Sequence, residues 1–409
     1  MPAHGTRLGT RRLVTALYAF AFLDEFVLLY PVYALLFTDA GLTAAQVSAL
    51  FVLWSVTGIV LEVPSGALAD AVSRRALLVA APLVGAAGYA LWVTVPSFWA
   101  FAAGFVLWGV RGALVSGSLE ALVYTELDAR GAAGDYARVL GRSHTAAVLA
   151  VVLATALAAP VFGAGGYPLL GGFSVAAGLL ASLAALLLPE QRRGEEGRTG
   201  RNDSADDGGY IATLREGLRE AARVPAVRRA VLLVPAVTAL WGSLEEYTSL
   251  LVRGTGVATG QVPWWELVLW GGAGLGGLLA GRAAGLSAAG IGSLVALGGV
   301  LLAAGAASGV TAGIVAVAAG FGALQLAGVV VGAWLQDAVT GRARATVTSV
   351  ASLAAELVAV AVYVGYGVLA GPLGHARTFA LLGLVYLPVA AWVVRGSVPS
   401  RVPWPRVAP

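Results

Sequence analysis

The sequence predicts an all-α membrane protein in which twelve transmembrane helices form two six-helix pseudo-repeats. Of the 409 residues, 58% are hydrophobic and only 12% are charged, whereas a soluble protein carries about 25% charged residues. A transmembrane helix needs about 20 mostly apolar residues, and Pro, Gly or charged residues separate the apolar stretches. The expected spans are 13–37, 45–69, 75–95, 98–125, 142–162, 167–188, 230–252, 262–281, 288–308, 310–336, 345–370 and 376–394.

The arginines indicate which ends of these spans face the cytoplasm. All 26 basic residues are Arg, and with the N-terminus inside, 23 of them fall in inner segments. Arg253 and Arg377 fall outside, and Arg111 lies within a span. Because cytoplasmic loops are enriched in basic residues, we expect both termini in the cytoplasm and an even number of spans.

One long polar segment divides the chain. Residues 189–229 form an expected cytoplasmic linker, in which 210–223 have the spacing of an amphipathic helix on the inner membrane face. The linker separates an N-terminal six-helix bundle, 1–188, from a C-terminal one, 230–409.

A weak internal repeat agrees with this division. Leu23-Asp24-Glu25-Phe26 resembles Leu244-Glu245-Glu246-Tyr247, and the stretch from Gly41 to Val47 resembles the stretch from Gly256 to Val262. Some transporter folds are built from parallel repeats of this kind.

Several classes of site and function are excluded or disfavoured. The chain has no cysteine, which excludes disulfides and thiolate metal sites, and its three histidines are scattered. No nucleophile or metalloenzyme motif is present. We therefore expect no cofactor, no metal site and no enzymatic activity. The net charge of +4 comes from Arg in loops between apolar spans, so nucleic acid is not an expected partner.

The loop between the second and third spans carries a family resemblance. It has Gly66, then three residues, then Asp70, with Arg74 and Arg75 four and five positions later. This loop resembles the signature of the major facilitator superfamily, although the family usually has a basic residue in place of Ala71 and Gly in place of Ser73. The topology extends the resemblance to the whole chain.

The resemblance implies a cytoplasmic latch. Asp70 would face the N-terminal end of the eleventh span, where the helix dipole is positive. Arg74 would pair with a carboxylate at the inner end of the fourth span, with Glu126 preferred over Glu120. The stretches 62–70 and 116–124 resemble a drug-efflux-like, drug:proton antiporter branch. The expected latch residues are Gly66, Asp70, Arg74, Arg75, Glu126, Glu120 and Glu62.

Ionisable residues inside the membrane cost about 2.5–3.5 kcal/mol each by insertion scales and usually face a cavity or a partner. The resemblance implies that spans 1, 4, 7 and 10 line a central cavity. The expected proton-coupling residues are Asp24, Glu25, Arg111 and Glu356. The expected substrate contacts are Tyr30, Trp241, Glu245, Glu246 and Tyr247.

Each of these residues has a structural alternative. Arg111 can form a static ion pair with Asp24 or Glu25, and the aromatic residues can serve plain packing or a membrane belt. Neighbours on a helix cannot both face a cavity, so one acid of each adjacent pair can be structural. Glu266 is expected near the outer surface, in contact with solvent.

The expected function is proton-coupled efflux of amphipathic small molecules by alternating access. The expected partners are a small-molecule substrate, protons and the lipid bilayer, with the protein acting as a monomer in a bacterial plasma membrane. Two alternatives stay open: a proton-coupled uptake symporter of the same fold, and a membrane sensor or assembly protein that transports nothing.

Overall fold

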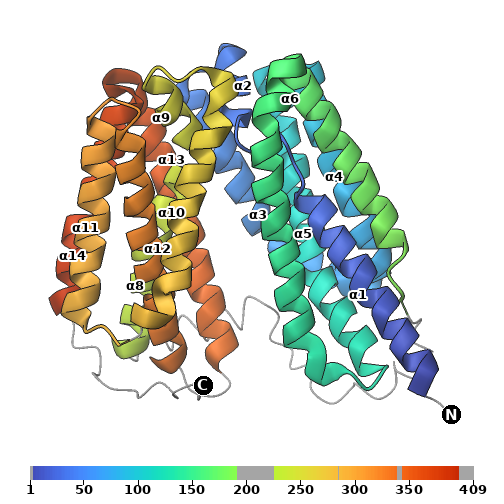
Figure 1. The fold of residues 1–409 in the computed structure, drawn as a ribbon. Helices are drawn as coiled ribbons and strands as arrows, with labels where there is room; N and C mark the ends of the chain where they lie inside the picture. The colour runs from blue at the N-terminus through green and yellow to red at the C-terminus, as the bar shows by residue number, and fades with distance from the viewer. Residues whose placement is uncertain (1–2, 191–224, 284, 339–342, 396–409) are drawn as a thin grey trace. The chain divides into compact units, whose positions relative to one another are not determined.

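The structure is a computed structural model that describes residues 3–190, 225–283, 285–338 and 343–395, and every regular element within those ranges is a helix (Figure 1). The chain divides into two compact units, residues 1–42 with 49–206 and residues 43–48 with 207–409. The amphipathic helix expected at 210–223, most of the expected linker and the C-terminal end of the chain lie outside the described residues.

The described part of the first unit has six α-helices, and a 3-10 turn at Ala133–Asp135 lies between the last two. They are α1 (Ala3–Glu25), α2 (Tyr33–Asp39), α3 (Ala44–Ala71), α4 (Arg74–Thr94), α5 (Phe98–Asp128) and α6 (Tyr136–Leu186). Serine side chains cap two of these helices: Ser73 Oγ accepts from the N–H of Ala76 and Ser97 Oγ from the N–H of Ala100. Such caps satisfy N–H groups that have no partner inside the helix.

Within its described residues, the second unit contains seven α-helices and a 3-10 turn at Thr259–Gln261. They are α8 (Pro225–Glu245), α9 (Thr248–Gly254), α10 (Val262–Ala283), α11 (Ala288–Ala307), α12 (Gly313–Ala338), α13 (Ala343–Leu384) and α14 (Tyr386–Arg395). Seven helical stretches of the described chain are long and apolar enough to cross a membrane. Two of these stretches, Ala133–Leu186 and Val347–Arg395, hold 54 and 49 residues, far more than one crossing requires.

Both long stretches fold back on themselves. Val139 and Ala184 of α6 belong to one buried cluster, although a straight helix would place them about 68 Å apart. The reversal occurs at Gly165 and Gly166, which leave helical geometry. In α13, the rings of Tyr366 and Phe379 lie 5.8 Å apart, against about 20 Å along a straight helix.

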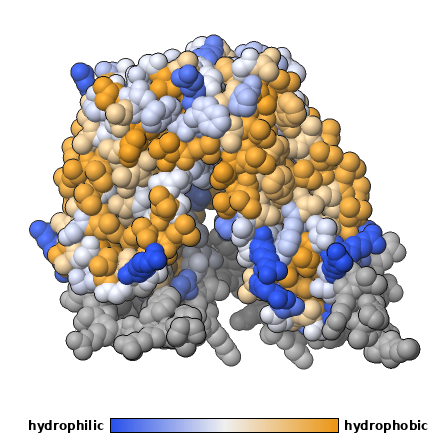
Figure 2. Space-filling view, viewed as in Figure 1, coloured by the Kyte–Doolittle hydropathy of each residue, from blue (hydrophilic) through white to orange (hydrophobic). Residues whose placement is uncertain are grey.

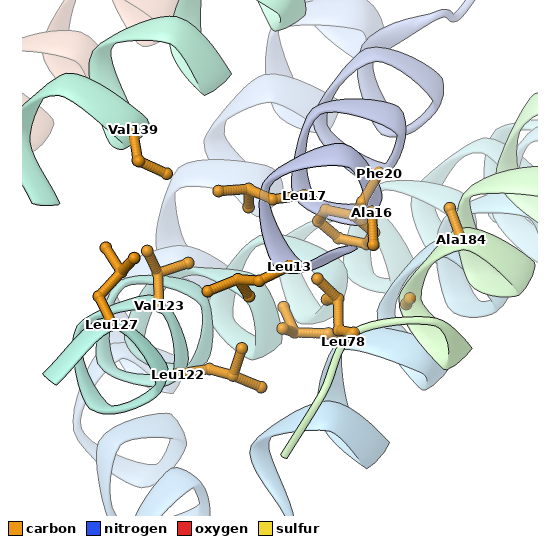
Figure 3. Close-up of a cluster of buried hydrophobic side chains, with 12 residues drawn as sticks. Leu13, Ala16, Leu17, Phe20, Leu78, Leu122, Val123, Leu127, Val139 and Ala184 are labelled. Carbon is orange, nitrogen blue, oxygen red and sulfur yellow. The ribbon is translucent and has the colours of Figure 1, made fainter. Parts of the chain in front are cut away.

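The buried cluster of the first unit gathers side chains from four helices (Figure 3). Leu13, Leu17 and Phe20 of α1 meet Leu122 and Leu127 of α5, and the cluster extends to α4 and to both arms of α6. Their apolar side chains point toward one another, so this cluster ties the arms of α6 to α1.

Apolar side chains also cover the outside of each unit. In Figure 2, hydrophobic residues occupy most of the visible flanks, and hydrophilic residues gather near the helix ends. Exposed examples include Leu183, Leu278 and Val368, at 57%, 79% and 68% exposure. Large exposed apolar surfaces of this kind mark a membrane-embedded protein, and the chain is a multi-pass membrane protein.

The first helix of each unit breaks at its acid pair, which corrects the expectation of one continuous helix over 13–37 and one over 230–252. α1 ends at Glu25 and α2 begins at Tyr33, while α8 ends at Glu245 and α9 begins at Thr248. The residues that follow repeat as well, since Gly41 and Gly256 have φ values of 94° and 91°. The short sequence repeat is therefore also a repeat of backbone conformation.

Local chemistry explains the break in the first unit. Pro31 lacks an N–H donor and disfavours helical geometry at the residue before it. The chain between the helices still needs partners for its polar groups, and the N–H of Leu29 donates to the buried Ser174 Oγ at 3.3 Å. A side chain of α6 thus supports irregular backbone inside the first unit.

Candidate functional site

A buried ion triad lies where α1 ends. Arg111, in the middle of α5, places Nη2 2.6 Å from Asp24 Oδ2 and 2.9 Å from Glu25 Oε1. Its Nε donates to Asp24 Oδ1 at 3.1 Å, and Nη2 also donates to the backbone carbonyl of Asp24. The structure thus brings together three of the four residues predicted for proton coupling, and a single guanidinium faces two carboxylates.

The two acids of the triad have different surroundings. The side chains of Asp24 and Arg111 are almost fully buried, whereas the Glu25 side chain is 34% exposed. Asp24 therefore has the geometry of a static ion pair, which was the structural alternative for Arg111. The Glu25 side chain, in contrast, is partly exposed. The phenol of Tyr30 donates to Glu25 Oε2 at 3.2 Å.

Tyr30 also begins a stack of aromatic rings. Its ring lies parallel to that of Trp108, with centroids 5.4 Å apart, and Trp108 stacks in turn on Trp54 at 4.9 Å. All three side chains are half-buried. Tyr33 and Trp92 pack edge-on against Trp108, and Phe105 stacks on it with centroids 5.8 Å apart. We call Tyr30, Trp108 and Trp54 the aromatic stack, and its flat faces suit a flat or cationic ligand.

The second unit carries its own acids near the break between α8 and α9. Glu245 and Glu246 are half-buried, and Tyr247 is fully buried. The Tyr247 ring stacks on Tyr366 at 3.6 Å, and its hydroxyl lies 2.7 Å from Ser48 Oγ, which belongs to the same unit.

Trp241 lies one turn before these acids. The Tyr386 hydroxyl accepts from the N–H of Trp241 and donates to the carbonyl of Val237. The Trp241 ring packs against Phe321 at 5.4 Å, and its Nε1 has no hydrogen-bond partner among the described residues. Trp241 is therefore held by Tyr386 and Phe321, and its buried Nε1 donor is unsatisfied within the described residues.

Glu266 differs from its expected position. The sequence placed it near the outer surface in contact with solvent, but its exposure is only 4%. It lies four residues into α10, where α9 packs against the helix, and Thr248 Oγ1 lies 2.9 Å from its Oε2. The expectation was wrong because distance along the helix from its end does not reveal the cover supplied by a neighbouring short helix.

Glu356, the fourth residue predicted for proton coupling, belongs to the second unit. It is exposed on α13, two turns before Tyr363.

Comparison with known proteins decides the family. Residues 14–363 match the family model described as Major Facilitator Superfamily. The chain belongs to the major facilitator superfamily. Among curated proteins, none matches the chain significantly.

Solved structures of superfamily transporters share the fold. A bacterial homolog of the human lysosomal transporter Spinster, inward-facing and unoccupied, aligns with a TM-score of 0.69 and 15% identity, covering 96% of each chain. The nucleoside transporter NupG aligns at 0.70 with 12% identity, covering 93% of this chain and 97% of its own. A POT family peptide transporter aligns at 0.66 with 13% identity, covering 93% and 96%. At these identities the likeness concerns the fold alone.

The superfamily signature loop lies between α3 and α4. Gly66 and Asp70 fall within α3, but their surroundings lie outside what the structure describes. Ser73, which stands where the superfamily usually has Gly, caps α4.

The basic residues of the loop contact the first unit. Arg74 donates to the Ala121 carbonyl and to Thr125 Oγ1, both at 3.1 Å, in the C-terminal part of α5. Arg75 donates through its backbone N–H to Glu190 and through Nη1 to the Leu188 carbonyl. These bonds join the loop to the end of α6.

The acids expected in the latch have distinct settings. Glu126 is buried and accepts from Arg130 Nη1 at 2.6 Å, whereas Glu62 and Glu120 are exposed. Glu126 therefore has a cation partner in Arg130, two residues after the end of α5.

Sequence reasoning missed two features of the site. Trp108 was not among the expected substrate contacts, yet it is the ring that joins Tyr30 to Trp54. The contact between Thr248 and Glu266 was not expected at all. The sequence did contain a signal for this contact. Glu266 lies in an otherwise apolar span, where an acid is costly unless it has a partner.

Proposed function

We propose that this superfamily member is a secondary transporter that exports flat, amphipathic small molecules in exchange for protons. The supporting observation is that Tyr30 contacts both a carboxylate and the aromatic stack: its hydroxyl donates to Glu25 and its ring lies on Trp108. A proton on Glu25 would change the acceptor of that hydrogen bond, and the ring that contacts a stacked substrate would respond. Proton binding and substrate binding would thus be linked through one side chain.

The proposed coupling residues are Asp24, Glu25, Arg111 and Glu356, with Glu25 as the acid that exchanges its proton. The proposed substrate contacts are Tyr30, Trp241, Glu245, Glu246 and Tyr247, joined by Trp108. Tyr247 is fully buried against Tyr366, so it would reach a substrate only after that packing opens. Acids on the substrate side favour a cationic or neutral ligand over an anion.

The energetics allow one proton to suffice. Holding a 100-fold gradient of a neutral solute costs about 2.7 kcal/mol. One charge crossing a potential of about 150 mV releases about 3.5 kcal/mol. A single exchanging carboxylate such as Glu25 therefore meets the requirement.

The proposal includes twelve spans, with both termini in the cytoplasm of a bacterial plasma membrane. Because they fold back, α6 supplies two crossings and the stretch from α13 to α14 supplies two more. The pair α1 and α2 supplies one crossing, and the pair α8 and α9 supplies another. The 23 inner arginines support the orientation. The stretches 62–70 and 116–124 support the drug:proton antiporter-like branch.

Uptake of a flat solute is the second candidate function. Of the solved structures, one is a nucleoside transporter, and a nucleobase is a flat ring that the aromatic stack of this chain would suit. The two functions share a fold and differ in direction, so a directional assay separates them.

The test is transport in membrane vesicles of both orientations with an imposed pH gradient. The probes are fluorescent cationic dyes and radiolabelled nucleosides. We expect inverted vesicles to concentrate a dye, and Glu25→Gln to abolish accumulation while downhill exchange persists. Asp135→Asn, which removes an exposed carboxylate paired with Arg138, is the matched control. If Glu25→Gln and the double variant with Asp24→Asn both concentrate dye like the wild type, the coupling site lies elsewhere.

A further inference from the structure

Glu266 forms a buried contact that the proposed function does not use. It lies on α10, and Thr248 lies at the start of α9, with exposures of 4% and 2%. Thr248 Oγ1 is 2.9 Å from Glu266 Oε2 and 2.6 Å from the backbone carbonyl oxygen of Glu245. The other carboxyl oxygen, Oε1, is buried and has no hydrogen-bond partner among the described residues.

The hydrogen atoms available to this contact determine its chemistry. A threonine hydroxyl has one hydrogen to donate and can also accept. That hydrogen can be directed at the Glu245 carbonyl oxygen, the closer acceptor at 2.6 Å, or at Glu266 Oε2 at 2.9 Å. An ionised Glu266 is acceptor-only, as the carbonyl is, so one of these two contacts would then have no hydrogen between its oxygens. A protonated Glu266 donates to Thr248 Oγ1, and both contacts are then hydrogen bonds.

The charges around Glu266 favour the same form. The acid pair Glu245 and Glu246 directly precedes Thr248 in the chain, and negative charges nearby disfavour a charge on Glu266. The charged residue of α9 is Arg253, and the 3-10 turn Thr259–Gln261 has no titratable side chain. α12 packs against α10 through glycines and carries none between Gly313 and Gln336. Within the described residues neither Glu245 nor Glu266 forms an ion pair.

Burial of a charge without a partner is much more costly than burial of a neutral carboxylic acid. A metal cation is a poorer occupant than a proton, because ions such as Ca²⁺ need six to eight oxygen ligands, and no group of three or more acidic or histidine side chains among the described residues has the arrangement to hold one.

We propose that Glu266 is a proton-binding site of the second unit, with Thr248 Oγ1 as the acceptor of the bound proton. On binding, the carboxylate takes one proton on Oε2 and donates it to Oγ1, while the Thr248 hydroxyl keeps its own hydrogen directed at Glu245. On release, the carboxylate regains its charge and the hydrogen bond from Glu266 Oε2 to Thr248 Oγ1 is lost. This site is separate from Asp24, Glu25 and Arg111 and does not depend on the proposed direction of transport.

Infrared difference spectroscopy of the full chain in lipid nanodiscs tests the site without any substrate. We expect acidic buffer to produce the carbonyl band of a protonated carboxyl group, which Glu266→Gln removes. Asp135→Asn should keep the band. The Gln side chain has the same shape as the protonated acid and can donate to Thr248.

Thr248 provides the second measurement and keeps the test valid if Glu266→Gln fails to fold. Thr248→Val removes the acceptor, so the band should shift to higher frequency, whereas Thr248→Ser should leave it in place. A band that is unchanged in both Glu266→Gln and Thr248→Val would overturn the proposal. Loss of the band on replacing choline with Na⁺, in the wild type and equally in Asp135→Asn, would also overturn it in favour of a metal cation. Failure of dye transport would leave these spectra unaffected, so the two proposals can fail separately.

Discussion

The guanidinium of Arg111 contacts the carboxylate of Asp24 through two nitrogens, with Nη2 2.6 Å from Oδ2 and Nε 3.1 Å from Oδ1. Two-point contacts of this kind are the strongest ion-pair geometry that proteins use. The same Nη2 also reaches Glu25, but through one oxygen of a more exposed side chain. Arg111 therefore makes its two-point contact with Asp24, and the proposed function assigns the exchanging proton to Glu25.

Breaking this pair should destabilise the protein. Arg111→Met leaves two carboxylates close together without a cation, and removal of one partner from a buried ion pair typically costs about 3–5 kcal/mol. Thermal unfolding of the detergent-purified variant measures the loss. Arg138→Met, which breaks an exposed pair with Asp135, should cost at most about 1 kcal/mol.

A double variant checks that the loss comes from the pair. Asp24→Asn with Arg111→Met should lose less stability than the sum of the single variants, because contacting residues are not additive. Additive losses would show that Asp24 and Arg111 stabilise the protein independently.

Gly85 of α4 provides the space that Arg111 occupies. A Cβ added at Gly85 would lie 2.7 Å from Arg111 Cδ, which is closer than real Cβ contacts. Gly85→Ala should therefore displace Arg111 and lower both the melting temperature and proton-driven accumulation.

The control is Gly112→Ala, on α5 next to Arg111. A Cβ at Gly112 meets nothing within 4 Å, so Ala should be neutral or should stabilise the helix by up to about 1 kcal/mol. Equal behaviour of the two variants would contradict the packing of Arg111 against α4.

The latch predicted from the signature loop rests on Asp70. Asp70→Asn removes the charge expected to face a helix N-terminus, an interaction worth about 0.3–1 kcal/mol. We expect faster labelling of a cytoplasmic Cys probe at Ala121 and slower transport, with normal insertion into the membrane. Wild-type transport by a well-expressed Asp70→Asn protein would count against the latch.

The orientation can be tested on a natural cysteine-free background, since the chain contains no Cys. A single Ser204→Cys variant should resist a membrane-impermeant thiol reagent added to intact cells and react after permeabilisation. The matched variant Thr255→Cys lies in the outer turn expected after the seventh span and should react in intact cells. Ready labelling of position 204 from outside would overturn the topology.

The sequence was sufficient for the fold class, because hydrophobic stretches and a signature loop are local features. Asp24, Glu25 and Arg111 were also recognised from their cost inside a membrane. Which acid contacts Arg111 in two-point geometry depends on the rotation of α1 against α5, and no pattern in either helix specifies that rotation.

The helix breaks were harder to predict. The apolar run of span 1 continues through residues 26–32, and nothing but Pro31 interrupts it. Between α8 and α9 there is neither Pro nor Gly, so periodicity predicted one helix. Glu266 was misplaced for a related reason, since the short helix α9 that covers it exists only because of that break.

The reversals inside α6 and α13 have a consequence for reading variant surveys of this protein. Gly166 has φ 61° and ψ −155°, and Gly374 has φ 77° and ψ 165°, a region that side-chain-bearing residues enter at a cost of about 1–3 kcal/mol. Both positions lie away from the acids and the aromatic stack in the sequence. Substitutions there should reduce how many molecules reach the membrane, while each surviving molecule turns over normally. A survey scored by cell growth alone would therefore count two hairpin glycines as functional residues unless protein abundance is measured beside it.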